Sequence, residues 1–390
     1  MKLESTNKKK EFIINNKAIF YEDDDFPIKI NSFPHPYQVE IVRNLTTYSK
    51  FLQQADFIII DSNILKIYKV DNIDPKKVFI IEAKEENKNL STVECLIKKL
   101  IDCEISKGSM VIAVGGGIIQ DISACACALF RRGQPFTYFP TTTLGQLDSC
   151  VGAKCAINTL EAKNILGLFS APRNVKIPIF MIKSMPKLDH IAGLSEMFRL
   201  CLTCSDDAVE KYFYFINHLY EPDRLNFNLY IKAIRLSLSI KKSVVDFDEY
   251  EKDVRRSMNY GHTFGHALEK YLDFRLPHGI AVLIGMHIAN IYSNKIKILP
   301  NNILKDLQEI FRKTAEKIKP ESNYIKDIKP KQIIELFKFD KKGDGSSVPL
   351  VLLKKPGEII FKRHYFSSEN KELEDSIQIA KDEFNEWINF

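Results

Sequence analysis

Two histidines, His262 and His266, lie four residues apart in the segment MNYGHTFGHALEKY, and a third, His278, follows downstream. At this spacing the first two share one face of a helix. Together with a carboxylate, these imidazoles could surround a divalent ion such as zinc. The same spacing is compatible with His262 capping or packing against a helix while His266 faces solvent. Gly261 and Gly265 flank the pair and weaken the packing alternative, but the spacing alone leaves both open.

Glu196, in AGLSEMFRL, is the carboxylate that best suits such a site. Its neighbours are mostly apolar, and a buried carboxylate without a partner is costly. We expect Glu196 at the start of another helix. Arg199 follows it by one turn, and Lys241 and Arg255 come further along the chain. These cations fit either a solvated helix face of mixed charge or a site for a phosphate and a second acid group.

A glycine turn, Gly115–Gly117, joins a predicted strand to a predicted helix in VIAVGGGIIQDISACA. Glycines let the backbone approach a phosphate, and a helix N-terminus offers free N–H donors. The GxGxxG pattern is absent, and a plain tight turn would explain the same residues. Asp61, at the end of an earlier predicted strand, could accept a hydrogen bond from a ribose hydroxyl. Segment 139–158 is rich in threonine and holds Asp148 and Lys154, which suit phosphate or sugar contacts from a loop and a helix start.

Strands and helices alternate in the first half of the chain. We predict strands in 55–63, 77–83, 109–117 and the segment FTYFP, and helices over 91–105 and 121–133. This alternation is typical of a parallel, doubly wound sheet. From about residue 186 onward, helical patterns dominate. We therefore expect an α/β fold with an N-terminal doubly wound domain over 1–185 and a mostly α-helical domain over 186–390.

The composition argues against several classes of function. The 390 residues carry a formal net charge of +6 spread along the chain, which does not indicate a nucleic-acid surface. No apolar run approaches transmembrane length, and the lysine-rich N-terminus lacks the apolar core of a signal peptide. Eight cysteines lie mostly in apolar runs, and the CxxC pair Cys201 and Cys204 has no second pair beside it. We expect a cytoplasmic protein with reduced thiols that binds neither nucleic acid nor membrane.

Taken together and in order, these stretches resemble the 3-dehydroquinate synthase family of sugar phosphate cyclases. The likeness runs from about residue 57 to about residue 353 and rests on AKEENKNLSTV, AVGGGIIQD, RRGQPFTYFPTTTLGQLDSCVGAKCAIN, AKNILGLFSAP, AGLSEMF, KKSVVDFDEYEKDVRRSMNYGHTFGHALE, LPHGIAVLIGM and DKKGDG. No single segment decides the assignment; their joint order and spacing do. The resemblance implies a dehydroquinate synthase-like fold, with an NAD-binding domain followed by a metal-binding domain.

The resemblance also implies a role for individual residues. Glu196, His262 and His278 would bind a divalent metal, zinc or cobalt. The implied NAD contacts are Asp61, Asn63, Glu85, Lys88, Gly115, Gly116, Gly117, Asp121, Thr141 and Thr142. Further positions for cofactor or substrate are Asp148, Lys154, Lys163, Asn164, Lys241, Arg255, Asn259, His266 and Lys341.

The resemblance also implies which residues hold each end of the substrate. The acid end would be held by Lys154, Lys241 and Arg255. The phosphate end would be held by Arg199, His266, Asn259 and Lys341. Arg132 matches an arginine that reaches a phosphate in the partner subunit, which implies a homodimer.

The implied chemistry converts a 7-phosphorylated heptulosonate into a carbocycle without net redox change. NAD takes a hydride from a secondary alcohol, the ketone acidifies the adjacent C–H, phosphate is eliminated and the hydride returns. Ring opening and an aldol addition then close the carbocycle. The metal would polarise the oxygen that is oxidised. The surrounding residues must hold one flexible sugar through every step.

The chain departs from the family pattern at several positions. Gln120 replaces a glycine, Arg199 replaces a lysine, and Ile280 replaces an acidic residue, while Thr143, Gly145, Cys150 and Ala153 alter the threonine-rich segment. These changes suggest a divergent member, whose substrate could be another sugar phosphate such as sedoheptulose 7-phosphate. Retention of Arg255 favours a substrate with a carboxylate. A metal-dependent alcohol or polyol dehydrogenase and a catalytically silent binding protein are the rival functions.

Overall fold

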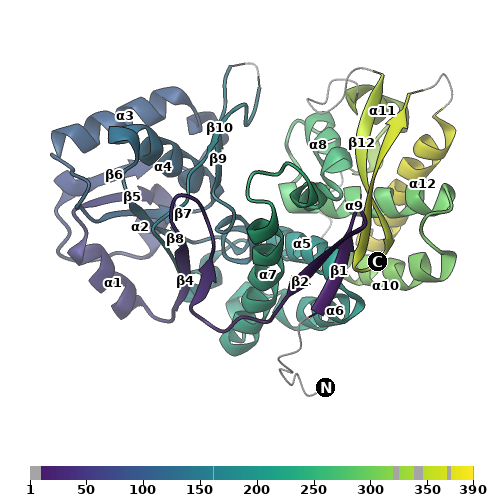
Figure 1. Ribbon diagram of the computed structural model, residues 1–390, viewed down its shortest axis with the longest axis horizontal. Helices are drawn as coiled ribbons and strands as arrows, with labels where there is room; N and C mark the ends of the chain where they lie inside the picture. Colours follow the sequence, from purple (N-terminus) through teal and green to yellow (C-terminus); the bar gives the residue numbers. More distant parts are fainter. Residues whose placement is uncertain (1–9, 161, 319–324, 338–345, 367–369, 390) are drawn as a thin grey trace. The chain divides into compact units, whose positions relative to one another are not determined.

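The computed structural model describes residues 10–160, 162–318, 325–337, 346–366 and 370–389 (Figure 1). The chain forms two compact units. One is Asp24–Met185, which we call the α/β unit; the other combines Met1–Asp23 with Pro186–Phe390 and is called the helical unit. No helix in the described ranges is long and apolar enough to cross a membrane.

A mostly parallel sheet forms the centre of the α/β unit. Its strands are β3 (Ile28–Ile30), β4 (Tyr37–Val42), β5 (Phe57–Asp61), β6 (Val78–Ile81), β7 (Val111–Gly115), β8 (Phe136–Pro140) and β11 (Asn174–Pro178). The helices that alternate with them are α1 (Leu45–Gln54), α2 (Ser62–Ile67), α3 (Leu90–Asp102) and α4 (Gly117–Leu129). Within the described residues the strand order is β3-β4-β11-β8-β7-β5-β6, and only β3 and β4 pair antiparallel.

The central strands of this sheet are formed by unbroken apolar runs. Every residue of β5 (FIIID) and β7 (VIAVG) is buried, as expected for strands covered on both faces. Ile58, Ile112 and Val114 belong to one core cluster with Tyr48 and Phe139. Burying each large side chain contributes roughly 1.5–3 kcal/mol before conformational entropy is counted.

Parallel pairing brings three strand ends to one edge of this sheet. β5 pairs with β7, and β7 pairs with β8, all in parallel. Asp61 ends β5, Gly115 ends β7, and Thr141 directly follows β8. In open α/β sheets, ligands bind beyond the carboxyl ends of the strands. We therefore expect a cofactor to bind at the sheet edge that carries these three residues.

A hairpin of β9 (Lys154–Ile157) and β10 (Leu166–Phe169) extends from the α/β unit (Figure 1). Before it, Gly145–Ser149 forms one short turn of π-helix. We expected a loop and a helix start in segment 139–158: the helical turn holds Asp148, whereas Lys154 lies in β9, where it pairs with Phe169 on the opposite strand. The partner strand lies outside segment 139–158, so that segment alone did not indicate the pairing.

Long helices make up most of the helical unit. They are α5 (Lys187–Cys204), α6 (Asp206–Leu219), α7 (Phe227–Phe247), α8 (His262–Tyr271), α9 (His278–Lys295), α10 (Asn301–Ala315), α11 (Pro330–Phe337) and α12 (Lys371–Asn389). In α9, every residue from Gly279 to Ser293 is buried, so this helix forms the centre of the unit. The dominance of helices after residue 186 is confirmed, but α5 begins nine residues before Glu196 rather than at it. Pro186, with its fixed φ, directly precedes the first turn.

The helical unit also contains a sheet that the sequence did not predict. Its strands are β1 (Lys10–Ile14), β2 (Lys17–Tyr21), β12 (Ser347–Lys355) and β13 (Glu358–Tyr365), in the order β12-β13-β1-β2. β1 pairs in parallel with β13, with Ile13 opposite Glu358. Our domain over 1–185 included residues 10–23, whereas the structure groups them with the helical unit. A pairing between opposite ends of the chain leaves no local signal, which explains the difference.

Candidate metal centre and cofactor site

Three histidines come together in the helical unit. His262 and His266 lie on α8, and His278 is the first residue of α9. One ring nitrogen from each lies within 4.8 Å of the others, and no second group of three potential metal ligands occurs in the described ranges. The rings of His262 and His278 have their centroids 5.2 Å apart. Both histidines of the i,i+4 pair thus belong to one cluster, although His266 is also exposed to solvent.

Glu196 reaches the same cluster from the middle of α5. Its Oε1 lies 3.4 Å from Nε2 of His278 and 3.8 Å from Nε2 of His262. The Glu196 side chain is 1% exposed, and within the described ranges Oε1 has no hydrogen-bond partner. A buried oxygen in this state is costly unless a cation or donor compensates it. One carboxylate and two imidazoles are a common ligand set for a catalytic zinc ion.

The outer nitrogens of two of these rings are held by neighbouring groups. Nδ1 of His278 lies 3.2 Å from both carboxylate oxygens of Glu269. Nδ1 of His262 lies 3.2 Å from the backbone carbonyl oxygen of Tyr260. The Tyr260 side-chain hydroxyl in turn donates a hydrogen bond to Asn290 on α9. Such contacts place the proton on Nδ1 and leave Nε2 as the ligand atom. Sequence reasoning missed Glu269, although it lies seven residues after His262 and so on the same helical face.

Glycines allow the three helices to approach closely enough for this geometry. A Cβ at Gly279 would lie 1.9 Å from the carbonyl oxygen of Ala192 on α5. A Cβ at Gly285 on α9 would lie 2.2 Å from the carbonyl oxygen of Gly261, just before α8. Any larger residue would push the helices apart. The glycines around the histidine motif therefore position the ligands.

The two imidazoles that face Glu196 differ in their affinity for a proton. Burial lowers the pKa of His262 well below its usual 6.5, and the nearby Arg199 charge lowers it further. Burial also opposes protonation of His278, but its contacts with Glu269 and Glu196 outweigh that and raise its pKa to about 8. His262 is therefore neutral at pH 7, with an electron pair ready for a cation.

Arg199 forms a buried ion pair with Glu196. Its Nε donates a hydrogen bond to Glu196 Oε2 at 2.7 Å, and both side chains are buried, at 2% and 1% exposure. Its Nη1 is 3.3 Å from the sulfur of Met258. The sequence places this arginine at the phosphate end of a substrate, whereas in the structure it contacts a candidate metal ligand.

Three other expected substrate residues of the helical unit lie on α7 and on the 3₁₀ helix Val254–Asn259 that precedes α8. Lys241 on α7 and Arg255 are buried, at 8% and 2% exposure. The Arg255 guanidinium donates to the carbonyl oxygen of Glu249. Asn259 donates its amide N–H to Glu251 Oε1 at 2.5 Å. His266 is exposed, and Lys341 lies outside the described residues.

The predicted cofactor residues of the α/β unit lie around the sheet edge described above. Asp61 caps α2, where its Oδ1 accepts a hydrogen bond from the Asn63 N–H at 2.9 Å. Burial raises the pKa of Asp61. Gly116 caps α4, and a Cβ at Gly117 would meet no protein atom within 4 Å. The space in front of this helix N-terminus is therefore open to a ligand.

A second group of expected cofactor residues forms a polar network near the β9–β10 hairpin. Lys88 Nζ contacts Asp121 Oδ2 and Asn164 Oδ1, each at 2.6 Å. Glu85 Oε1 accepts a hydrogen bond from Asn158 at 2.8 Å. Burial raises the pKa of Asp121, although the Lys88 charge opposes that shift. The structure thus brings Glu85, Lys88, Asp121 and Asn164 close together, and sequence reasoning missed Asn158.

Gln120, one of the departures from the family pattern, anchors the turn that carries Asp148. Its amide N–H donates to the Ser149 carbonyl oxygen at 2.8 Å, and the Ser149 hydroxyl donates back to Gln120 Oε1 at 2.9 Å. Asp148 directly precedes Ser149 and is buried, at 7% exposure. In the preceding turn, Thr142 Oγ1 accepts a hydrogen bond from the Gly145 N–H at 3.0 Å. A glycine at position 120 would lack this anchor.

The remaining expected residues are exposed. Lys154 begins β9, and Lys163 lies between the two strands of the hairpin. Arg132 follows α4 with a positive φ of 61°, next to Arg131 at 51°. Consecutive non-glycine residues with positive φ are unusual.

Family models match most of this architecture. The 3-dehydroquinate synthase N-terminal model matches residues 78–192, and the C-terminal model matches residues 193–343. The chain belongs to the 3-dehydroquinate synthase family. It is 32% identical over 366 residues to the 3-dehydroquinate synthase of Pelagibacter ubique, covering 87% of this chain and 95% of that protein. It is 34% identical over 304 residues to that of Nitratiruptor sp., covering 75% and 81%.

Solved structures confirm the dehydroquinate synthase-like fold. A 2-deoxy-scyllo-inosose synthase complexed with carbaglucose-6-phosphate, NAD+ and Co2+ matches with a TM-score of 0.76 at 22% identity, covering 90% of this chain and 99% of that one. A 2-epi-5-epi-valiolone synthase from Streptomyces hygroscopicus subsp. jinggangensis 5008, with NAD+ and Zn2+ bound, matches with a TM-score of 0.74 at 21% identity, covering 92% and 99%. A probable glycerol dehydrogenase from Sinorhizobium meliloti gives 0.59 at 13% identity, covering 90% and 97%.

Proposed function

We propose that this protein is an NAD- and divalent-metal-dependent sugar phosphate cyclase. The reaction is conversion of a 7-phosphorylated heptulosonate into a carbocycle with elimination of phosphate, as in 3-dehydroquinate synthase or a close variant. The observation that carries the proposal is Glu196 Oε1, buried and facing the Nε2 atoms of His262 and His278. The relatives named 3-dehydroquinate synthase support the choice of reaction.

The donor set fits a metal ion. Glu196, His262 and His278 would hold it, because their ligand atoms converge and the outer nitrogens of both rings are already engaged. A bound zinc or cobalt ion supplies Lewis-acid polarisation of the oxygen at the reacting carbon. His266, which shares α8 with His262 but is exposed, is assigned to the substrate phosphate.

The sheet edge of the α/β unit fits a nicotinamide dinucleotide. The open space at Gly117, the N-terminus of α4 and the carboxylate of Asp61 suit a pyrophosphate and a ribose. Asn63, Glu85, Lys88, Gly115, Gly116, Asp121, Thr141 and Thr142 are assigned to the same cofactor. When bound, NAD accepts a hydride and later returns it.

The cations of the chain orient the substrate. Lys241 and Arg255 are buried, so their charges are poorly screened and attract a carboxylate strongly. Lys154 is assigned to the same acid end, and Asn259 and Lys341 to the phosphate end. Asp148, Lys163 and Asn164 complete the set that we assign to substrate or cofactor.

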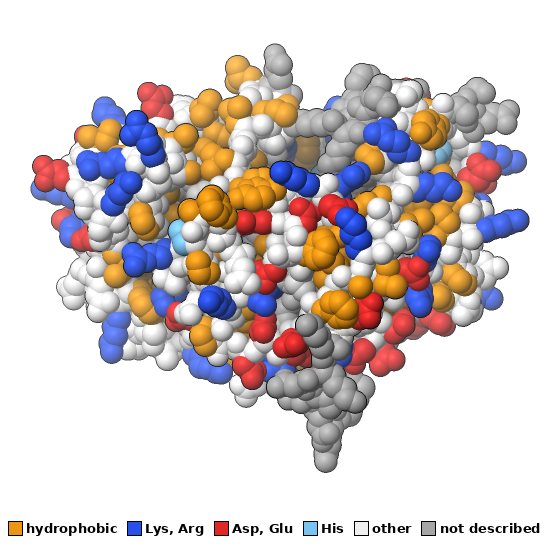
Figure 2. All heavy atoms as spheres, in the orientation of Figure 1, with side chains coloured by type: hydrophobic (Ala, Val, Ile, Leu, Met, Phe, Trp, Pro, Cys, Tyr) orange, Lys and Arg blue, Asp and Glu red, His pale blue; other side chains and the backbone are white. Residues whose placement is uncertain are grey.

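We also propose that the protein is a homodimer, with Arg132 reaching the partner's site. An exposed apolar group on and between the hairpin strands supports an interface: Leu160, Ile165, Leu166 and Phe169. Figure 2 shows hydrophobic side chains gathered where this hairpin lies in Figure 1. Large exposed apolar patches commonly mark interaction sites. All eight cysteines are free, which supports our assignment to the cytoplasm.

The decisive experiment is phosphate release from 3-deoxy-arabino-heptulosonate 7-phosphate and from sedoheptulose 7-phosphate, with metal-loaded protein and NAD. Absorbance of NADH is followed in the same reaction. We expect release from the first substrate without net NADH. Release from the second substrate alone would contradict the role given to Arg255. Net NADH with a simple polyol would instead identify a dehydrogenase, and binding without turnover a silent binding protein.

A matched pair of variants tests the division of roles among the histidines. H262A should lose its metal on dialysis, whereas H266A should keep the metal and lose phosphate release. Metal content by atomic absorption separates the two. Equal metal loss in both variants would make His266 a ligand.

A further inference from the structure

The two oxygens of Glu196 have different environments. Oε2 accepts the hydrogen bond from Arg199 Nε at 2.7 Å. Oε1 faces Nε2 of His278 and His262 at 3.4 and 3.8 Å and has no hydrogen-bond partner within the described ranges. One oxygen is therefore occupied by a donor, and only the other points into the histidine cluster.

Arg199 is itself held firmly in place. It lies on the same helix as Glu196, one turn later, and its side chain is only 2% exposed. Its Nη1 contacts the sulfur of Met258, which lies just before α8. A planar guanidinium fixed at two points offers its Nε–H in one direction, unlike the flexible ammonium of a lysine.

We propose that Arg199 is a positioning residue that reserves Oε1 of Glu196 as the single metal-binding oxygen. By occupying Oε2, it prevents the carboxylate from binding an ion through both oxygens. This inference rests on the metal centre proposed above and adds to it the coordination mode of one ligand. The residue acts through Glu196 and needs no contact with substrate.

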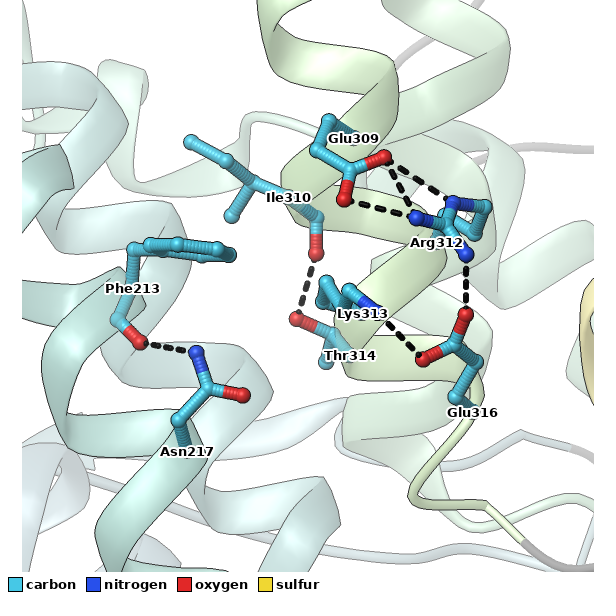
Figure 3. A network of polar contacts seen from close by, with 8 residues as sticks. All are labelled: Phe213, Asn217, Glu309, Ile310, Arg312, Lys313, Thr314 and Glu316. Atoms are coloured by element: carbon cyan, nitrogen blue, oxygen red, sulfur yellow. Dashed lines mark hydrogen bonds and ion pairs between the residues drawn. The ribbon is translucent and has the colours of Figure 1, made fainter.

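A second arginine–glutamate pair in the helical unit provides a matched control. Arg312 and Glu309 on α10 have the same i,i+3 relation, but Arg312 donates to both oxygens of Glu309, at 2.7 to 2.9 Å (Figure 3). Arg312 also pairs with Glu316, and its side chain is 38% exposed. R312M removes a pair of the same type away from the histidines.

The test is the visible d–d absorption of the Co2+-loaded protein, which reports the coordination number of the ion. R199M frees Oε2, so we expect a loss of absorption intensity as the carboxylate binds through both oxygens. R199Q places an amide N–H at the same number of bonds from Cα as Nε, so we expect the wild-type spectrum. R312M should also give the wild-type spectrum.

Each result decides between the possibilities. Wild-type spectra for both R199M and R199Q would overturn the inference, and so would the same altered spectrum for both, because charge rather than the hydrogen bond would then matter. If R199M does not fold by circular dichroism, R199Q decides alone: a wild-type spectrum supports the inference and an altered one overturns it. If the wild-type protein itself binds no Co2+, the metal centre and the proposed function fail, and the inference fails with them.

Discussion

The pairs Arg199–Glu196 and Arg312–Glu309 have the same sequence spacing and opposite surroundings. On α5 both partners are almost fully buried, and one carboxylate oxygen is left to face two imidazoles. On α10 both partners are partly exposed, and both carboxylate oxygens of Glu309 accept hydrogen bonds from Arg312 (Figure 3). In the exposed pair, arginine and water already satisfy the carboxylate oxygens, so the carboxylate has little to gain from binding an ion. In the buried pair, one carboxylate oxygen still lacks a hydrogen-bond partner within the described residues and can bind an ion. We propose that this difference separates a functional pair from a surface pair.

The largest effect should come from removing the carboxylates. E196Q should abolish stoichiometric metal binding and phosphate release, because a neutral amide is a poor ligand and the cluster loses the carboxylate oxygen that faces both His262 and His278. E309Q should leave both unchanged. Metal content after dialysis and phosphate release are measured for both variants. Retention of metal by E196Q would show that the Glu196 carboxylate is not needed to bind the ion.

The next effect concerns stability. R199M leaves a buried carboxylate without its cation, which costs on the order of 3–5 kcal/mol. Urea unfolding of the metal-free protein measures this difference. R312M should unfold at nearly the same urea concentration as the wild type, because exposed pairs contribute little. Equal loss in the two variants would mean that burial does not distinguish the pairs.

Salt should have almost no effect on the buried pair. Dissolved ions screen exposed charges within a Debye length of about 8 Å at physiological ionic strength, and they reach buried pairs far less. The stability difference between R199M and the wild type should therefore stay the same as NaCl is raised. A difference that shrinks strongly with salt would show that water and ions reach Glu196.

A further small effect should appear at the turn that carries Asp148. The Ser149 hydroxyl donates a hydrogen bond to Gln120 Oε1, and either single variant breaks it, so the double variant Q120A/S149A should lose less stability than the two single variants combined. The coupling energy should be about 1 kcal/mol. Urea unfolding of the four proteins measures it, and strict additivity would show that the two side chains act independently.

The sequence was most informative where structure depends on neighbours in the chain. Apolar runs indicated β5 and β7, and the apolar surroundings of Glu196 correctly pointed to a carboxylate that needs a partner. The sequence failed where a contact depends on side-chain direction or on distant segments. The spacing of Arg199 could not show that its Nε points at Glu196. Likewise, Gln120 and Ser149 are 29 positions apart and meet only because α4 and the turn pack together.

The parallel pairing of β1 with β13 has a consequence for synthesis of the protein. Ile13 is paired with Glu358, so β1 can meet this partner only after the long segment between them has been synthesised. Contacts between such distant positions form slowly, because a long loop must close before they stabilise anything. The α/β unit, Asp24–Met185, is continuous and can fold while the ribosome still produces the rest. Until β13 is available, the edge of β1 that pairs with it is open, and unpaired strand edges of this kind are templates for aggregation.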